Sequence, residues 1–311
     1  MENKLLVLIT TYSRGYNLPA VVESVVKQTF KNYKIFIADD HSPNNPTEII
    51  NGIKSKYPNV NIEHHRNPEN TGEGINFNIA LGREWDNGFK YIVLLQDDTV
   101  YTDNNFLSEG IQALENKPNV KYCSGLVSRN GRPDRFSIVP PTMKGFEVDG
   151  IDFWRLWATH LGLHWAAGIF RYNDILKYRL NPEIRKDCYN GDNLLLLSMA
   201  MAGSIIIFNK VVLESEYNND GGSYAKKFKD PVERFVTVEK YFRLAAESAQ
   251  EHGVSKEEAK DWLITRLVNT AVMMLNNIGQ NPAMLKNFTD TLLNYEPEVA
   301  TGLLNRILTQ R

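Results

Sequence analysis

Two pairs of adjacent aspartates are the residues of this chain best suited to chemistry: Asp39 with Asp40, and Asp97 with Asp98. Each pair directly follows a short apolar run rich in strand-forming residues, so both are expected just past the end of a strand. Carboxylates gathered in one place repel one another unless they bind a cation or accept hydrogen bonds. The alternative is that an aspartate here only caps the following helix or turn, which is less favoured for any one of them and far less for all four together. The two pairs together favour a site for a metal ion and a polar substrate.

The elements that would position these pairs alternate between strand and helix. Strands are predicted over 5–9, 35–38, 60–62 and 91–95. Apolar residues at helical spacing predict intervening helices over 18–26, with Asn17 as its N-cap, and over 48–53 and 75–85. Two later apolar runs, 205–208 and 211–213, predict the final strands. This order is typical of βαβ units and of a parallel sheet, in which ligands bind outside the carboxyl ends of the strands. Polar residues at those ends therefore join the candidate site: Thr10, Tyr12, Arg14, Arg66, Asn70 and Gly72.

The order of these pieces resembles the donor-binding half of family 2 glycosyltransferases of the GT-A fold. The matching pieces are Thr-Thr-Tyr-Ser-Arg at 10–14, Ala-Asp-Asp-His-Ser at 38–42, Arg-Asn-Pro-Glu-Asn-Thr-Gly at 66–72 and Leu-Leu-Gln-Asp-Asp-Thr at 94–99. The resemblance implies an α/β fold with a GT-A-like mixed, mainly parallel sheet flanked by helices. It also implies a nucleotide diphosphate sugar as donor, with Mn²⁺ or Mg²⁺ as the cofactor.

The resemblance implies a role for each residue of the candidate site. Thr10 and Tyr12 would hold the base and ribose of a uridine nucleotide by hydrogen bonding and stacking. Asp40 would accept a hydrogen bond from the ring N–H, and Arg66 would lie beside the base or the phosphates. Asp97 would contact the ribose or the sugar, and Asp98 would hold the metal ion on the diphosphate. The remaining members of the expected donor-binding set are Arg14, Asp39, Asn70 and Gly72.

A third acidic position is the candidate catalytic residue. In family 2 glycosyltransferases, the general base comes from a motif at the start of a helix, commonly Glu-Asp. The resemblance implies that Gly191-Asp192 occupies the corresponding position in this chain. Asp192 is therefore the expected base of an inverting transfer, although an aspartate at a helix start is most simply a cap. Several relatives also carry a histidine in a later loop, where this chain has Tyr-Asn-Asn-Asp-Gly-Gly-Ser at 217–223. Whether a second protein ligand completes the metal site is left open.

Beyond the donor half, the pattern changes twice. We expect a GT-A-like catalytic domain over 1–225, made of a nucleotide-sugar-binding half (1–110) and an acceptor half (111–225). Helix-start patterns at 230–233 and 255–258 predict that 226–311 is a helical C-terminal appendage. Its helices lack a polar face rich in Lys or Arg, which favours packing within the molecule or a homo-oligomer over membrane binding.

An aromatic and histidine cluster precedes the candidate base: Trp154, Trp157, His160, His164 and Trp165. The indoles are either a platform for sugar rings or ordinary core. The two histidines are four residues apart, as metal ligands on a helix would be, but no third ligand accompanies them, which favours structural roles. Two cysteines without metal or disulfide spacing, Cys123 and Cys188, are predicted to be buried thiols.

Composition excludes several classes of protein. With 42% hydrophobic and 23% charged residues the chain is neither coiled-coil, collagen-like nor disordered. A net charge of −2 without a long basic run gives no electrostatic footprint for nucleic acid. No apolar run is long enough to cross a membrane and no signal peptide is recognisable, so we expect a cytoplasmic protein, at most peripheral at the inner face of the membrane.

These observations predict a metal-dependent inverting glycosyltransferase that uses a nucleotide diphosphate sugar, with a UDP-sugar favoured. Its acceptor would be a glycan or a lipid-linked sugar, by analogy in bacterial surface polysaccharide synthesis. The alternative is a catalytically inactive nucleotide-sugar or glycan-binding protein on the same fold, which Gly191 and the absent loop histidine favour. A phosphatase of the haloacid dehalogenase type is a weaker alternative. Its motif, Asp-x-Asp-x-Thr after a strand, has two aspartates at alternate positions, whereas Asp97 and Asp98 are adjacent and would point to opposite sides.

Overall fold

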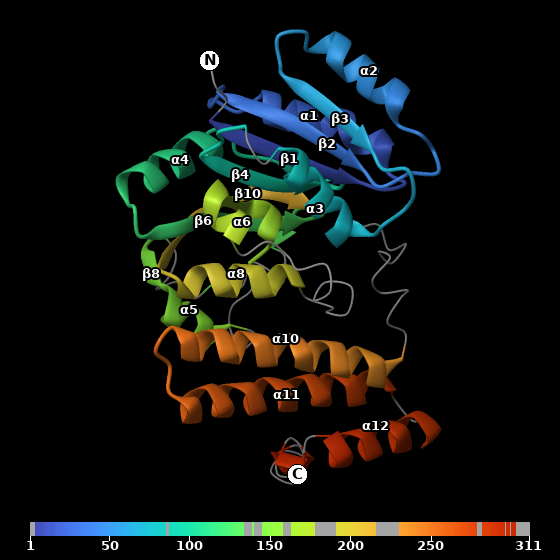
Figure 1. Ribbon diagram of the computed structural model, residues 1–311, viewed down its shortest axis with the longest axis vertical. Coiled ribbons are helices and arrows are strands. Elements are labelled where there is room, and N and C mark those ends of the chain that lie inside the picture. The colour runs from blue at the N-terminus through green and yellow to red at the C-terminus, as the bar shows by residue number, and fades with distance from the viewer. Residues whose placement is uncertain are drawn as a thin grey trace.

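One mixed sheet runs through the protein (Figure 1). The computed structural model describes residues 4–84, 87–133, 139, 145–157, 163–177, 191–215, 230–278, 282–295, 297–298 and 300–302. The strand order is β3-β2-β1-β4-β9-β6-β10-β5, with β7 paired to β6 and β8 paired to β10. The strands are β1 (Leu5–Thr11), β2 (Tyr33–Asp39), β3 (Ile62–Arg66), β4 (Tyr91–Gln96), β5 (Thr99–Tyr101), β6 (Val120–Arg129), β7 (Arg132–Pro133), β8 (Glu147–Asp149), β9 (Gly168–Arg171) and β10 (Ser204–Ser215).

The four N-terminal strands of this sheet are parallel. Strand β9 lies antiparallel between β4 and β6, and β10 is parallel to β6 but antiparallel to β5 and β8. Every residue of β1 and β2 is buried, as expected for strands covered on both faces. The predicted α/β fold with a mixed, mainly parallel sheet is confirmed.

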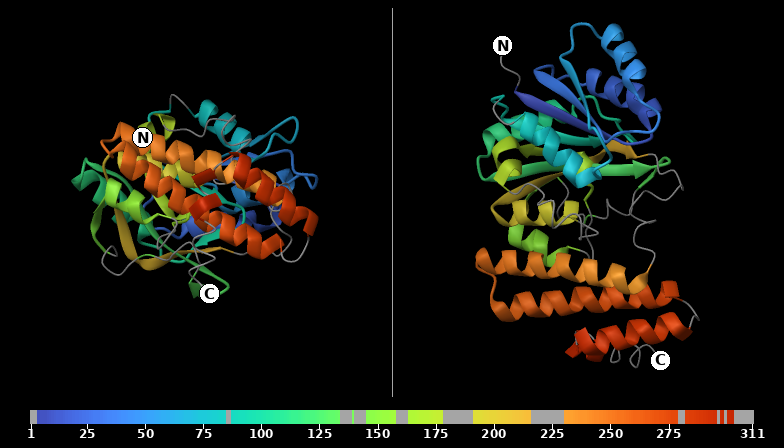
Figure 2. Two further views of the ribbon diagram at one scale, coloured as in Figure 1. Left: turned by 90° about the horizontal axis from the view of Figure 1, so that it is seen from below. Right: turned by 45° about the vertical axis from the view of Figure 1, so that its right-hand side comes forward.

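Helices flank the sheet and then continue away from it. Those within the first 201 residues are α1 (Leu18–Val26), α2 (Thr47–Lys56), α3 (Glu73–Arg83), α4 (Phe106–Asn116), α5 (Gly150–Leu156), α6 (Tyr172–Lys177) and α8 (Gly191–Met201), with short 3-10 turns η1 (Gly15–Asn17) and η4 (Trp165–Ala167). The C-terminal helices are α10 (Pro231–Glu251), α11 (Lys256–Ile278) and α12 (Pro282–Tyr295). Figures 1 and 2 show α10 next to the layer of α8 and α5, α11 beyond it, and α12 farthest from the sheet.

The predicted elements differ from the observed ones at three places. The strand predicted over 60–62 begins only at Ile62, because Val60 donates its backbone N–H to Tyr57 in a turn after α2. The runs 205–208 and 211–213 form the single strand β10, whose pairing with β6 shifts register between Ile207 and Val211. Asn17 precedes α1 without a capping hydrogen bond from its side chain, since it already has helical dihedral angles in η1.

Both predicted starts of the C-terminal helices are confirmed. The Asp230 side chain accepts a hydrogen bond from Val232 N, and the Ser255 hydroxyl accepts one from Glu258 N. Each bond satisfies one of the backbone donors that the first turn of a helix leaves unpaired. Among the described residues, no helix combines the length and the apolar character that crossing a bilayer requires.

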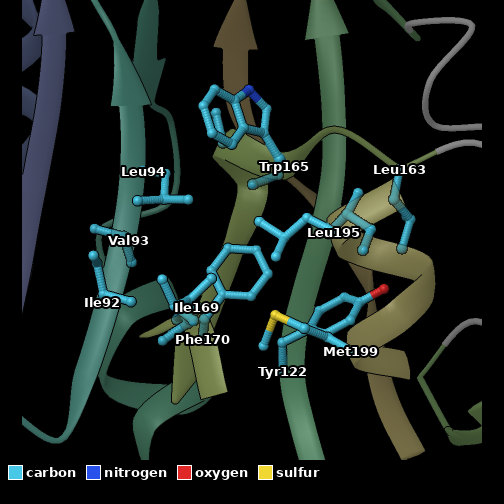
Figure 3. Close-up of a cluster of buried hydrophobic side chains, with 14 of the residues drawn as sticks. Ile92, Val93, Leu94, Tyr122, Leu163, Trp165, Ile169, Phe170, Leu195 and Met199 are labelled. Carbon is cyan, nitrogen blue, oxygen red and sulfur yellow. The ribbon is translucent and has the colours of Figure 1, made fainter. Parts of the chain in front are cut away.

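The tryptophans before the candidate base belong to the core. Trp165 lies with side chains of β4, β9 and α8, among them Val93, Phe170 and Leu195 (Figure 3), and is 3% exposed. Trp154 and Trp157 are also buried. Burying one large apolar side chain contributes about 1.5 to 3 kcal/mol, so these residues stabilise the acceptor half. They are not exposed platforms for a sugar.

Helix α11 is attached to the carboxyl end of α5. The indole N–H of Trp262 donates to Trp154 O (3.0 Å), and Arg266 donates to Trp157 O (2.8 Å) and Arg155 O (2.7 Å). The last turn of a helix leaves carbonyls without a full set of partners, and Trp154 O accepts here from Trp157 N (3.1 Å) as well as from Trp262. The rings of Trp262 and Trp154 stack with 4.7 Å between centroids. Burial lowers the pKa of Arg266 to about 10, yet its guanidinium stays charged at neutral pH.

The other end of α5 contacts α8. Gly150 donates to Gly203 O at 3.0 Å, and a Cβ on Gly150 would lie 1.8 Å from Ala200 O, so only glycine permits this approach. Helix α5 therefore connects α8 to the C-terminal helices. The predicted packing of the appendage within the molecule is confirmed for α11, whereas self-association stays a prediction.

Candidate functional site

The first four strands bring their carboxyl ends to one edge of the sheet, and most of the predicted site residues meet there. Pairing between the strands continues just past their ends: Asp40 N donates to Thr11 O (3.0 Å) and Asp97 N to Thr10 O (3.1 Å). Asn67 N donates to Asp39 O (2.8 Å) on the other side of β2. The two aspartate pairs are thus held by backbone hydrogen bonds in neighbouring positions of one rim.

Asp97 is almost completely buried at this rim, with 1% of its side chain exposed. Its Oδ2 accepts hydrogen bonds from the Thr11 hydroxyl (2.7 Å) and from Tyr12 N (3.1 Å), and its Oδ1 lies 2.6 Å from the Arg14 guanidinium. Burial raises the pKa of Asp97 to about 6, although Arg14 and Thr11 favour the charged form. Arg14 is therefore a main stabiliser of the charged form of Asp97.

Arg14 also contacts the second carboxylate of the pair. Its Nη1 donates to Asp98 Oδ2 at 2.8 Å, so one guanidinium spans both aspartates. Burial alone would lower the pKa of Arg14, but Asp97 and Asp98 outweigh that effect and the pKa is raised. The sequence placed Arg14 in the donor site without indicating this bridge.

The aspartate pair occupies the tight turn between β4 and β5. Thr99 closes the turn: its hydroxyl donates to Gln96 O (2.9 Å) and accepts from Gln96 N (3.1 Å). Thr99 also pairs with Ser215, the last residue of β10. Strand β10 thus ends beside the aspartates, and the loop predicted at 217–223 lies outside the described residues.

Asp40 is 2% exposed and both of its carboxylate oxygens accept several hydrogen bonds. Oδ1 accepts from Asn67 Nδ2 (3.0 Å), Thr71 N (2.9 Å) and the Thr71 hydroxyl (2.8 Å). Oδ2 accepts from Asn70 Nδ2 (3.0 Å) and Gly72 N (2.7 Å), and Gly72 has a φ of +86° that favours glycine. Asp40 therefore orders the loop before α3, and a nucleotide base would have to displace one of these donors to reach it.

Asp39 is fully buried and connects three segments of the rim. It accepts hydrogen bonds from the backbone N–H (2.9 Å) and the hydroxyl of Ser42, and it pairs with Arg66. The same Ser42 hydroxyl accepts from Ser13 N (3.0 Å), in the loop after β1. Arg66 is thereby directed toward Asp39, with 24% of its side chain exposed.

The remaining donor-site residues differ in their access to solvent. Thr10 is buried and its hydroxyl donates to Leu95 O at 3.5 Å. Tyr12 is 42% exposed although its backbone is fixed by Asp97. The exposed ring of Tyr12 is therefore available for stacking on a ligand.

The described residues fit a divalent cation at Asp98. Its Oδ1 is buried and has no hydrogen-bond partner in the described part of the chain. No group of three or more His, Cys, Asp or Glu is arranged there to hold an ion. Mg²⁺ is commonly bound by one or two carboxylates, with phosphate oxygens and water completing its shell, so one protein ligand suffices.

Asp192 lies in the first turn of α8, which begins at Gly191 as predicted. Negative charge is favoured at this end of a helix. The side chain of Asp192 lies outside the described residues, as do Asp187, Cys188 and His160. His164 accepts a hydrogen bond from Ala166 N (3.2 Å), a structural role as predicted. Cys123 is buried, and burial raises the pKa of its thiol to about 12.

The sheet topology and the carboxylate-lined rim are those of a GT-A fold. The chain belongs to glycosyl transferase family 2, whose family model matches residues 6–175. This membership confirms the resemblance seen in the sequence and argues against the phosphatase alternative.

Individual relatives agree with this assignment. The glycosyltransferase GlyG of Streptococcus pneumoniae is 26% identical over 104 residues, which are 33% of this chain and 33% of GlyG. A crystal structure of S. aureus TarS 1–349 in complex with UDP-GlcNAc superposes with a TM-score of 0.67 at 15% identity, and the match covers 96% of this chain and 83% of the TarS chain. The mannosyltransferase PcManGT of Pyrobaculum calidifontis, in complex with GDP-Man and Mn²⁺, superposes with a TM-score of 0.60 at 15% identity. That match covers 98% of this chain and 84% of the PcManGT chain. The matches to curated relatives span about a third of their length, and the structural likenesses show the fold alone.

Proposed function

We propose that this protein is a metal-dependent inverting glycosyltransferase that uses a nucleotide diphosphate sugar, with UDP-sugar favoured. The observation that carries the proposal is the rim formed by Asp97, Asp98 and Arg14, with Asp98 Oδ1 unpartnered among the described residues. The complexes of TarS with UDP-GlcNAc and of PcManGT with GDP-Man and Mn²⁺ support the donor class and the cation. The acceptor we propose is a glycan or lipid-linked sugar of a bacterial surface polysaccharide, at the inner face of the membrane.

In this proposal the donor half, residues 1–110, holds the nucleotide. Tyr12 stacks on the base, with Thr10 and Arg66 nearby, and Asp97 contacts the ribose or the sugar. Asp39 and Asp40 act mainly by ordering the loops around them, because their oxygens already accept hydrogen bonds from Ser42, Thr71 and Gly72. Asn70 and Gly72 belong to that ordered loop.

The acceptor half, residues 111–225, provides the base. Asp192 removes the proton from the acceptor hydroxyl as its oxygen attacks the anomeric carbon opposite the departing diphosphate, which inverts the configuration. Such proton transfer contributes about a hundredfold to ten-thousandfold in rate. Asp98 would hold the cation, which would supply Lewis-acid stabilisation of the negative charge on the leaving diphosphate. Helices of 226–311 support this half through α5 and α8.

The test is a panel of nucleotide sugars incubated with the protein, with Mn²⁺ or with a chelator, while free UDP or GDP is measured. We expect slow donor hydrolysis with one donor, lost in the chelator and in Asp98→Asn, which keeps the shape of the side chain but removes its charge. Binding of a donor without any turnover, even with candidate acceptors present, would instead favour the inactive binding protein.

A further inference from the structure

The guanidinium of Arg14 lies between the two carboxylates proposed for donor and cation binding, and the inference drawn from it rests on that proposed function. Its Nη2 is 2.6 Å from Asp97 Oδ1, and its Nη1 is 2.8 Å from Asp98 Oδ2. Charge-assisted pairs of this kind are roughly twice as strong as neutral hydrogen bonds. In this structure Arg14 therefore neutralises one of the two negative charges that would attract a cation.

Arg14 is the side chain of this group that can move. Its side chain is 34% exposed, against 1% for Asp97 and 18% for Asp98. The backbone on either side is fixed, since Ser13 N donates to Ser42 Oγ (3.0 Å) and Arg14 O accepts from Asn17 N (3.0 Å). Rotation about side-chain bonds, without a backbone change, is enough to release the carboxylates.

A cation held by Asp98 has to share that carboxylate with Arg14 or replace it. Positive charges close together at a partly exposed site repel, with an effect on affinity of about tenfold or more. A nucleotide diphosphate reverses this balance, because its negative charge stabilises a guanidinium and a cation together. Arginine is well suited to the exchange, since its planar fork of donors fits carboxylate and phosphate oxygens alike.

We propose that Arg14 couples cation binding to nucleotide binding. Without nucleotide, Arg14 holds the carboxylate pair and weakens the binding of a divalent cation to Asp98. With nucleotide bound, the guanidinium turns to the diphosphate oxygens and leaves Asp98 to the cation. The site therefore takes the cation and the diphosphate as a pair, and each raises the affinity of the other by the same factor.

The test measures Mn²⁺ binding by electron paramagnetic resonance, with and without UDP, so that no acceptor or turnover is needed. Arg14→Met removes the charge and keeps much of the side chain, and Arg14→Gln is a second uncharged variant should the first fail to fold. Without UDP we expect either variant to bind Mn²⁺ at least about tenfold more tightly than the unaltered protein. The factor by which UDP raises the Mn²⁺ affinity should fall correspondingly.

The matched control is Lys210→Met. Lys210 also bridges two carboxylates, contacting Asp103 and lying 2.6 Å from Glu109, but away from the rim. This variant should leave Mn²⁺ binding unchanged, and a gain equal to that of the Arg14 variants would overturn the proposal as a general effect of lost positive charge.

Two further outcomes are distinguishable. Equal Mn²⁺ affinities without UDP in the unaltered protein and the Arg14 variants, with binding retained when UDP is present, overturn the coupling role and leave the cation site at Asp98 intact. No Mn²⁺ binding to the unaltered protein even with saturating UDP overturns the metal dependence in the proposed function, and the coupling with it.

Discussion

Replacing Asp40 by asparagine separates two roles for this carboxylate, a direct contact with the nucleotide base and the ordering of the loop 67–72. Asparagine keeps one oxygen, which can still accept from Asn67 and Thr71. Its NH₂ group would face the donors Asn70 Nδ2 and Gly72 N, which lie 3.0 and 2.7 Å from Oδ2. Two donors would thus lose their acceptor at a site where Asp40 is 2% exposed.

The expected cost follows from these bonds. A hydrogen bond to a charged group contributes about 1.5 to 3 kcal/mol, so two lost bonds amount to about 3 to 6 kcal/mol. Asparagine is neutral, so the folded variant no longer buries a charge, and this gain offsets part of the cost. We expect the free energy of unfolding to fall by about 3 kcal/mol. Against a typical stability of about 5 to 15 kcal/mol, that loss is large.

The assay is urea unfolding followed by circular dichroism, together with calorimetry of UDP binding to the folded variant. The matched control is Asp149→Asn, since Asp149 caps α5 by accepting from Ile151 N (2.9 Å) and Asp152 N (3.2 Å), and asparagine caps a helix about equally well. The control should keep its unfolding midpoint, while that of Asp40→Asn should fall. If Asp40→Asn unfolds at the unaltered midpoint but binds UDP tenfold or more weakly, the loop-ordering role is refuted and the base contact is supported.

Two more predictions concern the acceptor half and the helix α11 that contacts it. Asp192→Asn should leave the melting temperature and the UDP affinity nearly unchanged, while the rate of sugar transfer falls by about a hundredfold or more. The reason is that asparagine keeps the shape of the side chain but cannot accept a proton. Near-native transfer by the folded variant would remove Asp192 from the mechanism. Trp262→Phe should lower the unfolding free energy by about 0.5 to 1.5 kcal/mol, because Trp154 O loses one of its two donors and keeps only Trp157 N. For that variant urea unfolding is the measurement, and an unchanged midpoint would show that α11 does not stabilise α5 through this bond.

The sheet edge was predictable because its signals are local. Short apolar runs that end in polar residues locate β1, β2 and β4, and parallel pairing then collects Thr10, Asp39 and Asp97 at one rim. The strand β3 was misplaced by a few residues because the apolar Val60 belongs to a turn, and hydrophobicity alone does not separate a turn from a strand end.

The bridge made by Arg14 was not predictable from spacing. It joins residues 84 positions apart in the sequence, and it depends on the register between β1 and β4 and on one side-chain rotamer. The same holds for the contact of α11 with α5: helical periodicity shows that a helix has an apolar face but not which partner covers it. The five donors around Asp40 belong to this class too, since they come from a loop about 30 residues away.

The attachment of α11 to α5 also bears on the order in which the chain folds during synthesis. The first four strands lie within residues 5–96 and pair with one another, so they can assemble once that stretch has left the ribosome. Helix α5 receives its donors from Trp262 and Arg266, which follow their acceptors by 108 to 111 positions. We expect a nascent chain stalled at residue 255 to resist pulse proteolysis in its first hundred residues while α5 is cut, and equal protection of both would show that α5 folds without waiting for α11.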